Sequence, residues 1–290
     1  MSSGKSKKSQ RLLLAAILAP VLIVAIGCVI WQPWNQGQSQ QTPPPATTTA
    51  VQEQSPSTDA YRAYIYGGLP KTTQAVNLLK NKGYMVGYSE DHKDPVWVAY
   101  RLVKVEHPPT LPRPPRFMVD ERTDAKVKSS DYTGSGYDRG HMAPNHAIAT
   151  RYGEEAQLET FLMSNICPQR PNLNRKVWEH LEATEADDYA NRFEEIWVID
   201  GPIFDESHAQ KLPAGIDVPV AFYKILVDEV GGKPRMLAFI MPQTVKGDEP
   251  FKAFLTNVAK VEAMTHLDFF WELDPTLEKQ LESETPKDTW

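Results

Sequence analysis

Apolar positions are distributed very unevenly along the chain. The longest apolar run occupies residues 12–31, which hold no charged side chain. A run of this length is enough for a helix to cross about 30 Å of hydrocarbon. Basic residues precede it, at Lys5, Lys7, Lys8 and Arg11, and no acidic residue occurs before Glu53. The pattern predicts a single transmembrane helix at residues 12–31, with a basic cytoplasmic N-terminus at residues 1–11 and export of the remainder.

Two other interpretations of this segment are weaker. A cleaved signal peptide has an apolar core of about 7–15 residues and small residues at its cleavage site, whereas bulky residues follow the run here. Gly27 and Cys28 resemble a lipoprotein site only faintly, because the apolar run continues past the cysteine. The other cysteine, Cys167, lies far along the chain. We therefore expect no intramolecular disulfide and interpret Cys167 as a small buried hydrophobe.

The apolar run is followed by a polar segment. Residues 32–58 are rich in Gln, Pro, Thr and Ser and contain almost no large apolar side chains. Such a segment cannot bury enough surface to fold, so we expect an extended linker. Beyond it, shorter apolar runs recur without an internal repeat to about Leu281. They predict one folded domain at residues 59–282, followed by an acidic tail at residues 283–290 that frays.

Within this domain, β-branched and aromatic runs predict strands at residues 84–88, 96–103, 195–204, 218–230 and 236–241. Gly231 and Gly232 predict a tight turn between the last two. Spaced apolar positions without Gly or Pro predict a long helix at residues 177–195, and residues 251–263 are also expected to be helical. The Pro-rich residues 107–116 are expected to be irregular. Strands joined mainly by local hairpins, with helices between them, indicate an α+β fold with a mostly antiparallel central sheet flanked by helices.

Charge is unevenly distributed as well. Residues 101–180 contain 12 Lys and Arg against 10 Asp and Glu, a net charge of +2. Residues 181–290 contain 10 against 22, a net charge of −12. A protein that binds nucleic acid without sequence preference normally presents a basic face. The composition does not favour this class, although a cleft needs only a few well-placed cations.

The segment from Asp138 to Ala147 holds the densest candidate chemistry. The imidazole of His141 can accept a proton near neutral pH. Arg139 lies two residues away, so in a strand both side chains face the same side and can meet one phosphate. Gly140 between them permits close approach to the backbone. His146 follows His141 by five residues with Pro144 between them, which excludes a helical zinc pair, and we interpret His146 as structural or surface-exposed.

A second group of polar residues lies between Ser164 and Glu182. The amide oxygen of Asn174 is a hard neutral ligand that suits Mg²⁺. On an α-helix, Glu182 would lie about 12 Å further along the axis and some 80° around it, so both cannot be direct ligands without strain. Glu182 can still lean back and hold a metal-bound water. The alternative is that Asn174 caps a helix and Glu182 is a surface acid.

Together these residues resemble a known family. Asp138-Arg139-Gly140-His141, Ser164-Asn165 with Pro168-Gln169, and Asn174 with Trp178 and Glu182 are similar to the DNA/RNA non-specific endonucleases, which include endonuclease G and have a ββα-metal (His-Me) finger. The resemblance covers residues 60–275. It implies His141 as general base, Asn174 as the direct Mg²⁺ ligand and Glu182 acting through metal-bound water. It further implies Arg139 near the scissile phosphate, Asn165 supporting the site and Asp138 in an orienting role.

The resemblance also implies a second arginine upstream on the phosphate. Arg116 is the best match, although Arg113 and Arg122 are close to it in sequence. The implied activity is Mg²⁺-dependent hydrolysis of DNA and RNA to 5′-phosphate products, with Mn²⁺ as a possible substitute for Mg²⁺ and a homodimer as a possible assembly.

Other functions and locations stay open at this point. A catalytically weak, membrane-tethered module that binds nucleic acid, for example in DNA uptake, is the main alternative. A structural envelope protein on a Pro-rich stalk is a further one. With the anchor, we expect a single-pass protein of a bacterial inner membrane whose catalytic domain faces the periplasm, or alternatively an anchor in the mitochondrial inner membrane.

Overall fold

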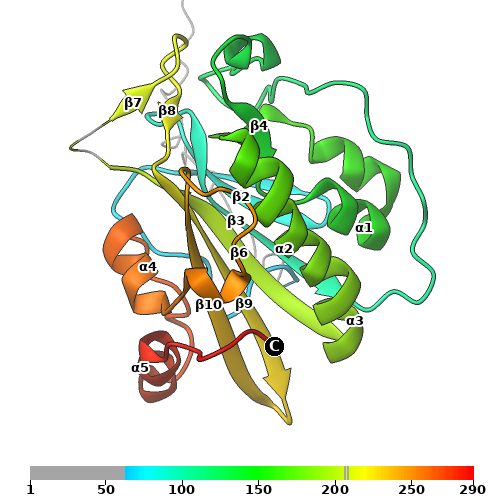
Figure 1. Ribbon diagram of the computed structural model, residues 1–290, viewed down its shortest axis with the longest axis vertical. Coiled ribbons are helices and arrows are strands. Elements are labelled where there is room, and N and C mark those ends of the chain that lie inside the picture. Colours follow the sequence, from blue (N-terminus) through cyan, green and yellow to red (C-terminus); the bar gives the residue numbers. More distant parts are fainter. Residues whose placement is uncertain (1–62, 206, 208) are drawn as a thin grey trace, which may run out of the picture. The chain divides into compact units, whose positions relative to one another are not determined.

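The β-branched and aromatic runs of the sequence come together in one central sheet (Figure 1). The computed structural model describes residues 63–205, 207 and 209–290, and within them seven strands lie in the order β1-β2-β3-β6-β9-β10-β11. Every neighbouring pair is antiparallel. The strands are β1 (Asn77–Asn81), β2 (Tyr84–Ser89), β3 (Asp94–Val103), β6 (Glu195–Ile203), β9 (Ala221–Val230), β10 (Lys233–Pro242) and β11 (Leu255–Thr256). The predicted mostly antiparallel sheet of an α+β fold is confirmed.

Helices and apolar cores cover both faces of this sheet. Side chains alternate along each strand, so Tyr84 and Val86 enter one core while Met85 enters the other. The first core is shared with α1 (Asn145–Glu159) and with a long helical stretch formed by η4 (Leu173–Trp178), α2 (Glu179–Thr184), η5 (Glu185–Tyr189) and α3 (Ala190–Phe193). The second is shared with α4 (Val258–Thr265) and α5 (Pro275–Ser283). Central strands are therefore buried on both faces, which explains their nearly continuous apolar sequences.

Two short strand pairs lie outside the central sheet. β4 (Asp138–His141) pairs with β5 (Ile166–Gln169), and β7 (Gln210–Lys211) pairs with β8 (Asp217–Val218), both antiparallel. A third, smaller apolar core joins them; it includes Tyr132, at the end of η2 (Ser129–Tyr132), and Met163, at the start of η3 (Met163–Asn165). This core gives β4 and β5 a rigid support of their own.

Two predicted elements differ from the structure. The helix expected at residues 251–263 is split into the 3₁₀ turn η7 (Phe251–Phe254), β11 and α4, because Asn257 caps α4 by accepting a hydrogen bond from the Lys260 N–H. The tail expected to fray is instead packed. Trp290 stacks edge-on against Tyr189 and Phe193, with ring centroids 5.5 Å apart in both cases.

The predicted location has to be corrected. No helix among residues 63–205, 207 and 209–290 is long and apolar enough to cross a membrane. The expected span at residues 12–31 and the expected linker at residues 32–58 lie outside the described residues. The assignment to a bacterial inner membrane, with its mitochondrial alternative, is therefore withdrawn.

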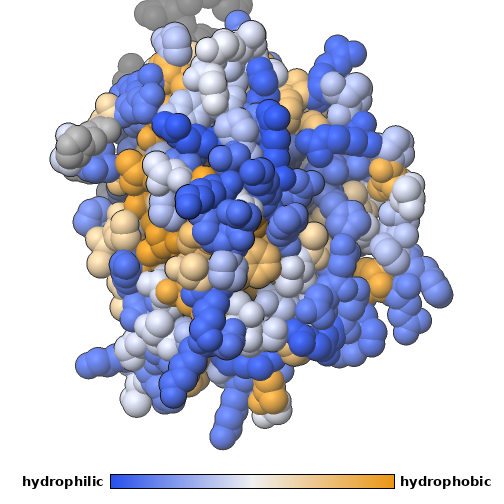
Figure 2. All heavy atoms as spheres, in the orientation of Figure 1, coloured by the Kyte–Doolittle hydropathy of each residue, from blue (hydrophilic) through white to orange (hydrophobic). Residues whose placement is uncertain are grey.

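One face of the molecule is strongly hydrophilic. Figure 2 shows its most hydrophilic side chains gathered between β4 and the loop that follows β10. The candidate residues lie on β4, η3, η4 and α2, except Arg116, which precedes η2. The functional site is therefore expected where β4 meets the long helical stretch.

Candidate active site

The segment from Asp138 to Ala147 forms strand β4 (Asp138–His141), a turn and the start of α1. Arg139 and His141 are therefore both in a strand. Arg139 and His141 alternate with Asp138 and Gly140 along the strand. Both Arg139 and His141 line a cavity of about 410 Å³, together with Asn174 and Glu182 from the long helical stretch. Four of the seven residues singled out in the sequence therefore meet at one cavity.

His141 is held neutral by its surroundings. Its side chain is 8% exposed and packs against Phe117 and Phe161, with ring centroids 5.3 and 4.9 Å away. Burial disfavours the imidazolium and the charge of Arg113 opposes it further, which lowers the pKa of His141 to about 3. An imidazole that is unprotonated at neutral pH is ready to accept a proton.

Burial of His141 makes a testable contribution to stability. The folded protein binds this proton only near pH 3, whereas the unfolded chain binds it near pH 6.5. The unfolded state thus holds more protons between these values, so the stability that a neutral His141 provides is present above pH 6.5 and is lost as the pH falls. We expect His141→Asn to reduce the slope of the unfolding free energy against pH by about 1.4 kcal/mol per pH unit, which corresponds to about one proton. Urea unfolding in EDTA between pH about 4 and 6 measures the slope, and an unchanged slope would contradict a neutral buried His141.

Asn165 does not line the cavity but fixes the backbone that follows His141. Its side chain is fully buried. Its Oδ1 accepts from the Ala143 N–H (2.8 Å), and its Nδ2 donates to the carbonyls of Ala143 and Thr160 (3.0 Å each). All the hydrogen-bonding capacity of this amide is therefore used to shape the turn between β4 and α1, in agreement with a supporting role.

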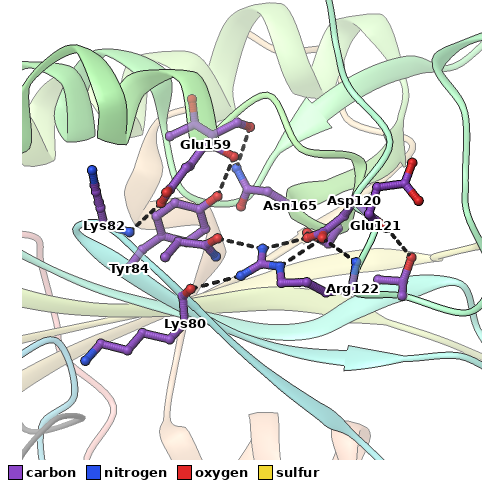
Figure 3. Close-up of polar contacts among 12 residues, drawn as sticks. Lys80, Lys82, Tyr84, Asp120, Glu121, Arg122, Glu159 and Asn165 are labelled. Carbon is purple, nitrogen blue, oxygen red and sulfur yellow. Dashed lines mark hydrogen bonds and ion pairs between the residues drawn. The ribbon is translucent and has the colours of Figure 1, made fainter.

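A polar network continues behind Asn165 (Figure 3). The neighbouring Ser164 hydroxyl donates to Asp120 Oδ2 (2.6 Å), and Arg122 donates to both oxygens of the same carboxylate. Arg122 also donates to the Lys80 carbonyl and to Asn81 Oδ1. Burial opposes ionisation of Asp120, but the bonds from Arg122 and Ser164 outweigh it and hold its pKa below the usual value. The network ties η3 to the end of β1.

The helical stretch brings Asn174 and Glu182 to the same cavity by an irregularity of its winding. Residues Leu173–Trp178 form a π-helical segment, in which hydrogen bonds span one residue more than in an α-helix. From Asn174 to Glu182 the chain advances by eight residues, but it rotates about as far as seven residues of a regular α-helix would, which is close to two full turns. The two side chains therefore share a face, and the 80° offset of a regular helix does not arise. Asn174 lies inside the helical stretch, so it is not the capping residue.

Asp138 orients Asn174. Its Oδ2 accepts from Asn174 Nδ2 (3.0 Å) and from Arg175 Nε (2.7 Å). With the amide nitrogen engaged in this way, the Oδ1 of Asn174 is left as the atom available to a ligand. Within the described residues no hydrogen bond to this oxygen is formed. The orienting role predicted for Asp138 would act through this hydrogen bond to Asn174.

Glu182 is a partly buried acid whose Oε1 is fully buried. In the described part of the chain its Oε1 has no hydrogen bond. Burial raises the pKa of Glu182 to about 8, against the opposing effect of the nearby Lys224. A carboxyl group of this kind is stabilised by an added cation, which makes its charged form favourable.

The arginine that reaches the cavity from upstream is Arg113. Its guanidinium lies 5.0 Å from the Phe161 ring centroid and lines the cavity with Arg139. Arg116, which the sequence favoured, is exposed and does not line this cavity, and Arg122 is engaged with Asp120. Of the three candidates Arg113 is thus the one that lines the cavity, and its contact with a phosphate stays a prediction. The Pro-rich segment has no regular periodicity, so the sequence held no signal for which arginine points inward.

The structure gives a reason for a glycine at position 140 that differs from the expected close approach of a ligand. A Cβ at this position would overlap the side-chain amide of Gln169, which lies directly over it. The glycine therefore accommodates close packing of β4 against β5.

His146 is exposed and lies 3.1 Å from Asp187 Oδ1, in agreement with a surface role. Cys167 is free and fully buried, as expected of a small hydrophobe.

Two further cavity residues were missed in the sequence. Asn145, the first residue of α1, lines the cavity, and its Oδ1 is buried without a hydrogen-bond partner among the described residues. Arg175 lines it beside Asn174. Asn145 follows the β4 segment by four residues and Arg175 follows Asn174 directly, so proximity in sequence was the only available signal.

The cavity suits a hard divalent cation. Its walls offer the Asn174 Oδ1, the unpartnered Glu182 Oε1 and the unpartnered Asn145 Oδ1, all oxygen atoms of the kind that Mg²⁺ prefers. Among residues 63–205, 207 and 209–290 no group of three or more His, Cys, Asp or Glu side chains is arranged to hold a metal. A cation that keeps most of its waters needs only one or two protein ligands, so this donor set fits Mg²⁺ better than a fully ligated transition metal.

Comparison with known proteins decides the family. Residues 65–276 match the family model of the DNA/RNA non-specific endonucleases. The chain belongs to this family. It is 29% identical over 222 residues to a Nostoc nuclease (71% of this chain, 77% of the relative) and 29% identical over 227 residues to human mitochondrial endonuclease G (70% and 71%). It is also 30% identical over 225 residues to nuclease C1 of Cunninghamella echinulata (69% and 85%).

The fold agrees with that membership. The structure is similar to a chain in the crystal structure of the EndoG/EndoGI complex, with a TM-score of 0.64 and 26% identity over 72% of this chain and 90% of the other. The family inferred from the sequence is thus confirmed, and the chain is a nucleic-acid hydrolase of the non-specific endonuclease family.

Proposed function

We propose that this non-specific endonuclease is Mg²⁺-dependent and hydrolyses phosphodiester bonds of both DNA and RNA to products with 5′-phosphates. The observation that carries the proposal is the convergence of a neutral His141, the Asn174 amide and the Glu182 carboxyl on one cavity that also holds arginine side chains. In this proposal β4, β5 and the helical stretch from Leu173 form the ββα-metal finger.

In the proposed reaction, His141 removes a proton from a water molecule that attacks phosphorus. Burial against Phe117 and Phe161 keeps the imidazole unprotonated, so a ring nitrogen carries the lone pair that accepts the proton. Asn165 keeps the imidazole in place because it fixes the backbone immediately after β4. No 2′-hydroxyl takes part in such an attack, so both nucleic acids are substrates.

The guanidinium groups of Arg139 and Arg113 neutralise the charge that develops on the phosphate oxygens. Arg139 is preorganised for this role, since its Nε donates to the Ser129 carbonyl (2.9 Å) and its guanidinium lies over the Tyr132 ring. Arg113 is fixed in a comparable way by the Phe161 ring. Little rearrangement is then needed when the charge develops.

Asn174 Oδ1 would hold the metal, with Asp138 orienting the amide and Glu182 close by. When bound there, Mg²⁺ or Mn²⁺ supplies Lewis acidity at the phosphate and stabilises the leaving oxygen. Homodimer formation stays a prediction.

Replacing Asn174 by Ala tests the assignment of the metal. We expect a loss of about 10³-fold in cleavage rate, because a catalytic metal contributes several kcal/mol to the transition state, together with loss of Mn²⁺ binding followed by electron paramagnetic resonance. Asn172→Ala removes an exposed amide two residues away and serves as the matched control. Parental Mn²⁺ affinity in Asn174→Ala would contradict the assignment.

A further inference from the structure

Exposed cations with carboxylate partners are common over this protein. Lys82 pairs with Glu155, Lys104 with Glu194 and Lys252 with Asp288. Other exposed cations, among them Lys233, Lys260 and Lys279, form no ion pair within the described residues, but they lie apart from one another. Beside the cavity three cations of this second kind lie together. Within the described part of the chain, the exposed side chains of Arg170, Lys176 and Lys246 have no carboxylate within ion-pair distance. A cluster of uncompensated cations repels itself, so its persistence beside a catalytic cavity points to an anionic ligand.

These three cations are held side by side by the surrounding backbone. The Arg170 N–H donates to Gln243 Oε1 (2.8 Å), and Gln243 Nε2 donates back to the Pro168 carbonyl (2.6 Å). Lys176 Nζ donates to the Lys246 carbonyl (3.3 Å). The end of β5, the start of the helical stretch and the turn after β10 are therefore joined, and each contributes one cation to the same surface.

Their side chains are also kept from other partners. The Arg170 guanidinium lies 5.7 Å from the Tyr137 ring centroid, which orients it without neutralising its charge. Glu249 lies close enough to Lys246 for their charges to attract each other. Its oxygens accept hydrogen bonds from the N–H groups of Lys246 and Gly247, and within the described residues it forms no ion pair with the Lys246 ammonium. The three cationic side chains stay exposed to solvent.

The surface is continuous with the cavity. Arg175 lies between Asn174 and Lys176 in sequence and lines the cavity, while Asn174 N donates to the Arg170 carbonyl (2.9 Å). Arg175 itself is paired with Asp138, so among the described residues of this region the unpaired cations are Arg113 and Arg139 at the cavity and Arg170, Lys176 and Lys246 outside it, with the Arg175–Asp138 pair between the two groups. Figure 2 shows this region, between β4 and the loop after β10, as strongly hydrophilic.

We propose that Arg170, Lys176 and Lys246 form an outer phosphate track, which binds the backbone of the nucleic-acid strand beyond the scissile phosphate. This inference rests on the proposed function only in taking a nucleic-acid strand as the ligand. It explains how a chain with a net charge of −6 binds a polyanion: attraction is confined to one strip that leads into the cavity. Contacts to phosphates read no sequence, which agrees with non-specific recognition.

The test is the salt dependence of binding. Affinity for a labelled single-stranded oligonucleotide is measured by fluorescence anisotropy in EDTA, at increasing NaCl, for the parent and for a variant carrying Arg170→Ala, Lys176→Ala and Lys246→Ala. Each phosphate contact contributes about 0.7 to the slope of log K against log salt for a single strand. We therefore expect the slope of the triple variant to be shallower by about 2, with weaker binding at every salt concentration.

A control of equal charge separates the track from net charge. Lys233→Ala, Lys260→Ala and Lys279→Ala remove three cations from the β9–β10 turn, α4 and α5, on elements away from the cavity, and should leave the slope at its parental value. A parental slope in the track variant, or an equal reduction in both variants, would overturn the proposal. If the parent binds with the expected slope but does not cleave in Mg²⁺, the proposed function fails and the track stands.

Discussion

Replacing His141 by Ala is expected to lower the rate of nucleic-acid cleavage by about 10²- to 10⁴-fold, the contribution of a well-placed general base. The imidazole is neutral because it is buried beside Arg113, and it lies at the same cavity as Asn174 and Glu182. Without it, the one other histidine that lines the cavity among the described residues is His146, which is exposed and paired with Asp187. Initial rates on plasmid DNA at saturating Mg²⁺ measure the loss.

His146→Ala is the matched control. This histidine also lines the cavity but is exposed and pairs with Asp187, so its loss should change the rate by no more than about twofold. Mn²⁺ binding by His141→Ala should stay near the parental value, because Asn174 and Glu182 are untouched. Near-parental turnover by His141→Ala would remove His141 from the reaction.

Replacing Lys224 by Met is expected to lower the free energy of unfolding by about 3–5 kcal/mol. Lys224 lies on β9 with its side chain fully buried, and its Nζ is 2.8 Å from Asp200 Oδ2 and 3.3 Å from Glu185 Oε1. It also donates to the Tyr100 hydroxyl (3.0 Å). Burial opposes its charge, but the two carboxylates outweigh this and raise the pKa of Lys224 above its usual value. Removing the cation leaves both acids buried without compensation.

Urea unfolding of Lys224→Met at neutral pH measures this loss. Lys233→Met, which removes an exposed cation at the β9–β10 turn, is the control and should shift the unfolding free energy by less than about 0.5 kcal/mol. Replacing Lys224, Asp200 and Glu185 together by apolar residues should recover much of the stability, since no unpaired charge then remains. A parental urea midpoint for Lys224→Met would show that Lys224 does not stabilise the protein through its ion pairs with Asp200 and Glu185.

The sheet could be predicted from the sequence because its strands are buried on both faces. Residues 84–88 and 96–103 were expected as strands and form β2 and β3, and the glycine pair at 231–232 turns β9 into β10 with positive φ at both residues. Strand β1 was missed because its burial is partial. Helix α1 was missed because its sequence lacks a clear apolar stripe and Gly153 interrupts its helical backbone.

The site could be predicted in part as a set of residues but not in its geometry. Residue types made His141, Asn174 and Glu182 candidates, and the resemblance to the family supplied their expected roles. That the last two share a face depends on a π-helical segment, which no periodicity of the sequence reveals. The placement of Arg113 depends on the path of a Pro-rich segment. Lys224 and Asp200 stand as charged residues within apolar strands, and their cross-strand pairing follows only from the strand order.

The central claim is that this chain is a metal-dependent endonuclease acting on both nucleic acids. The most direct measurement is a gel assay of the purified protein with plasmid DNA and with RNA, in Mg²⁺ and in excess EDTA, followed by analysis of the product ends. We predict cleavage of both substrates in Mg²⁺, with 5′-phosphates on the products, and none in EDTA. Binding of both nucleic acids with no cleavage in Mg²⁺, or equal cleavage in EDTA, would contradict the account.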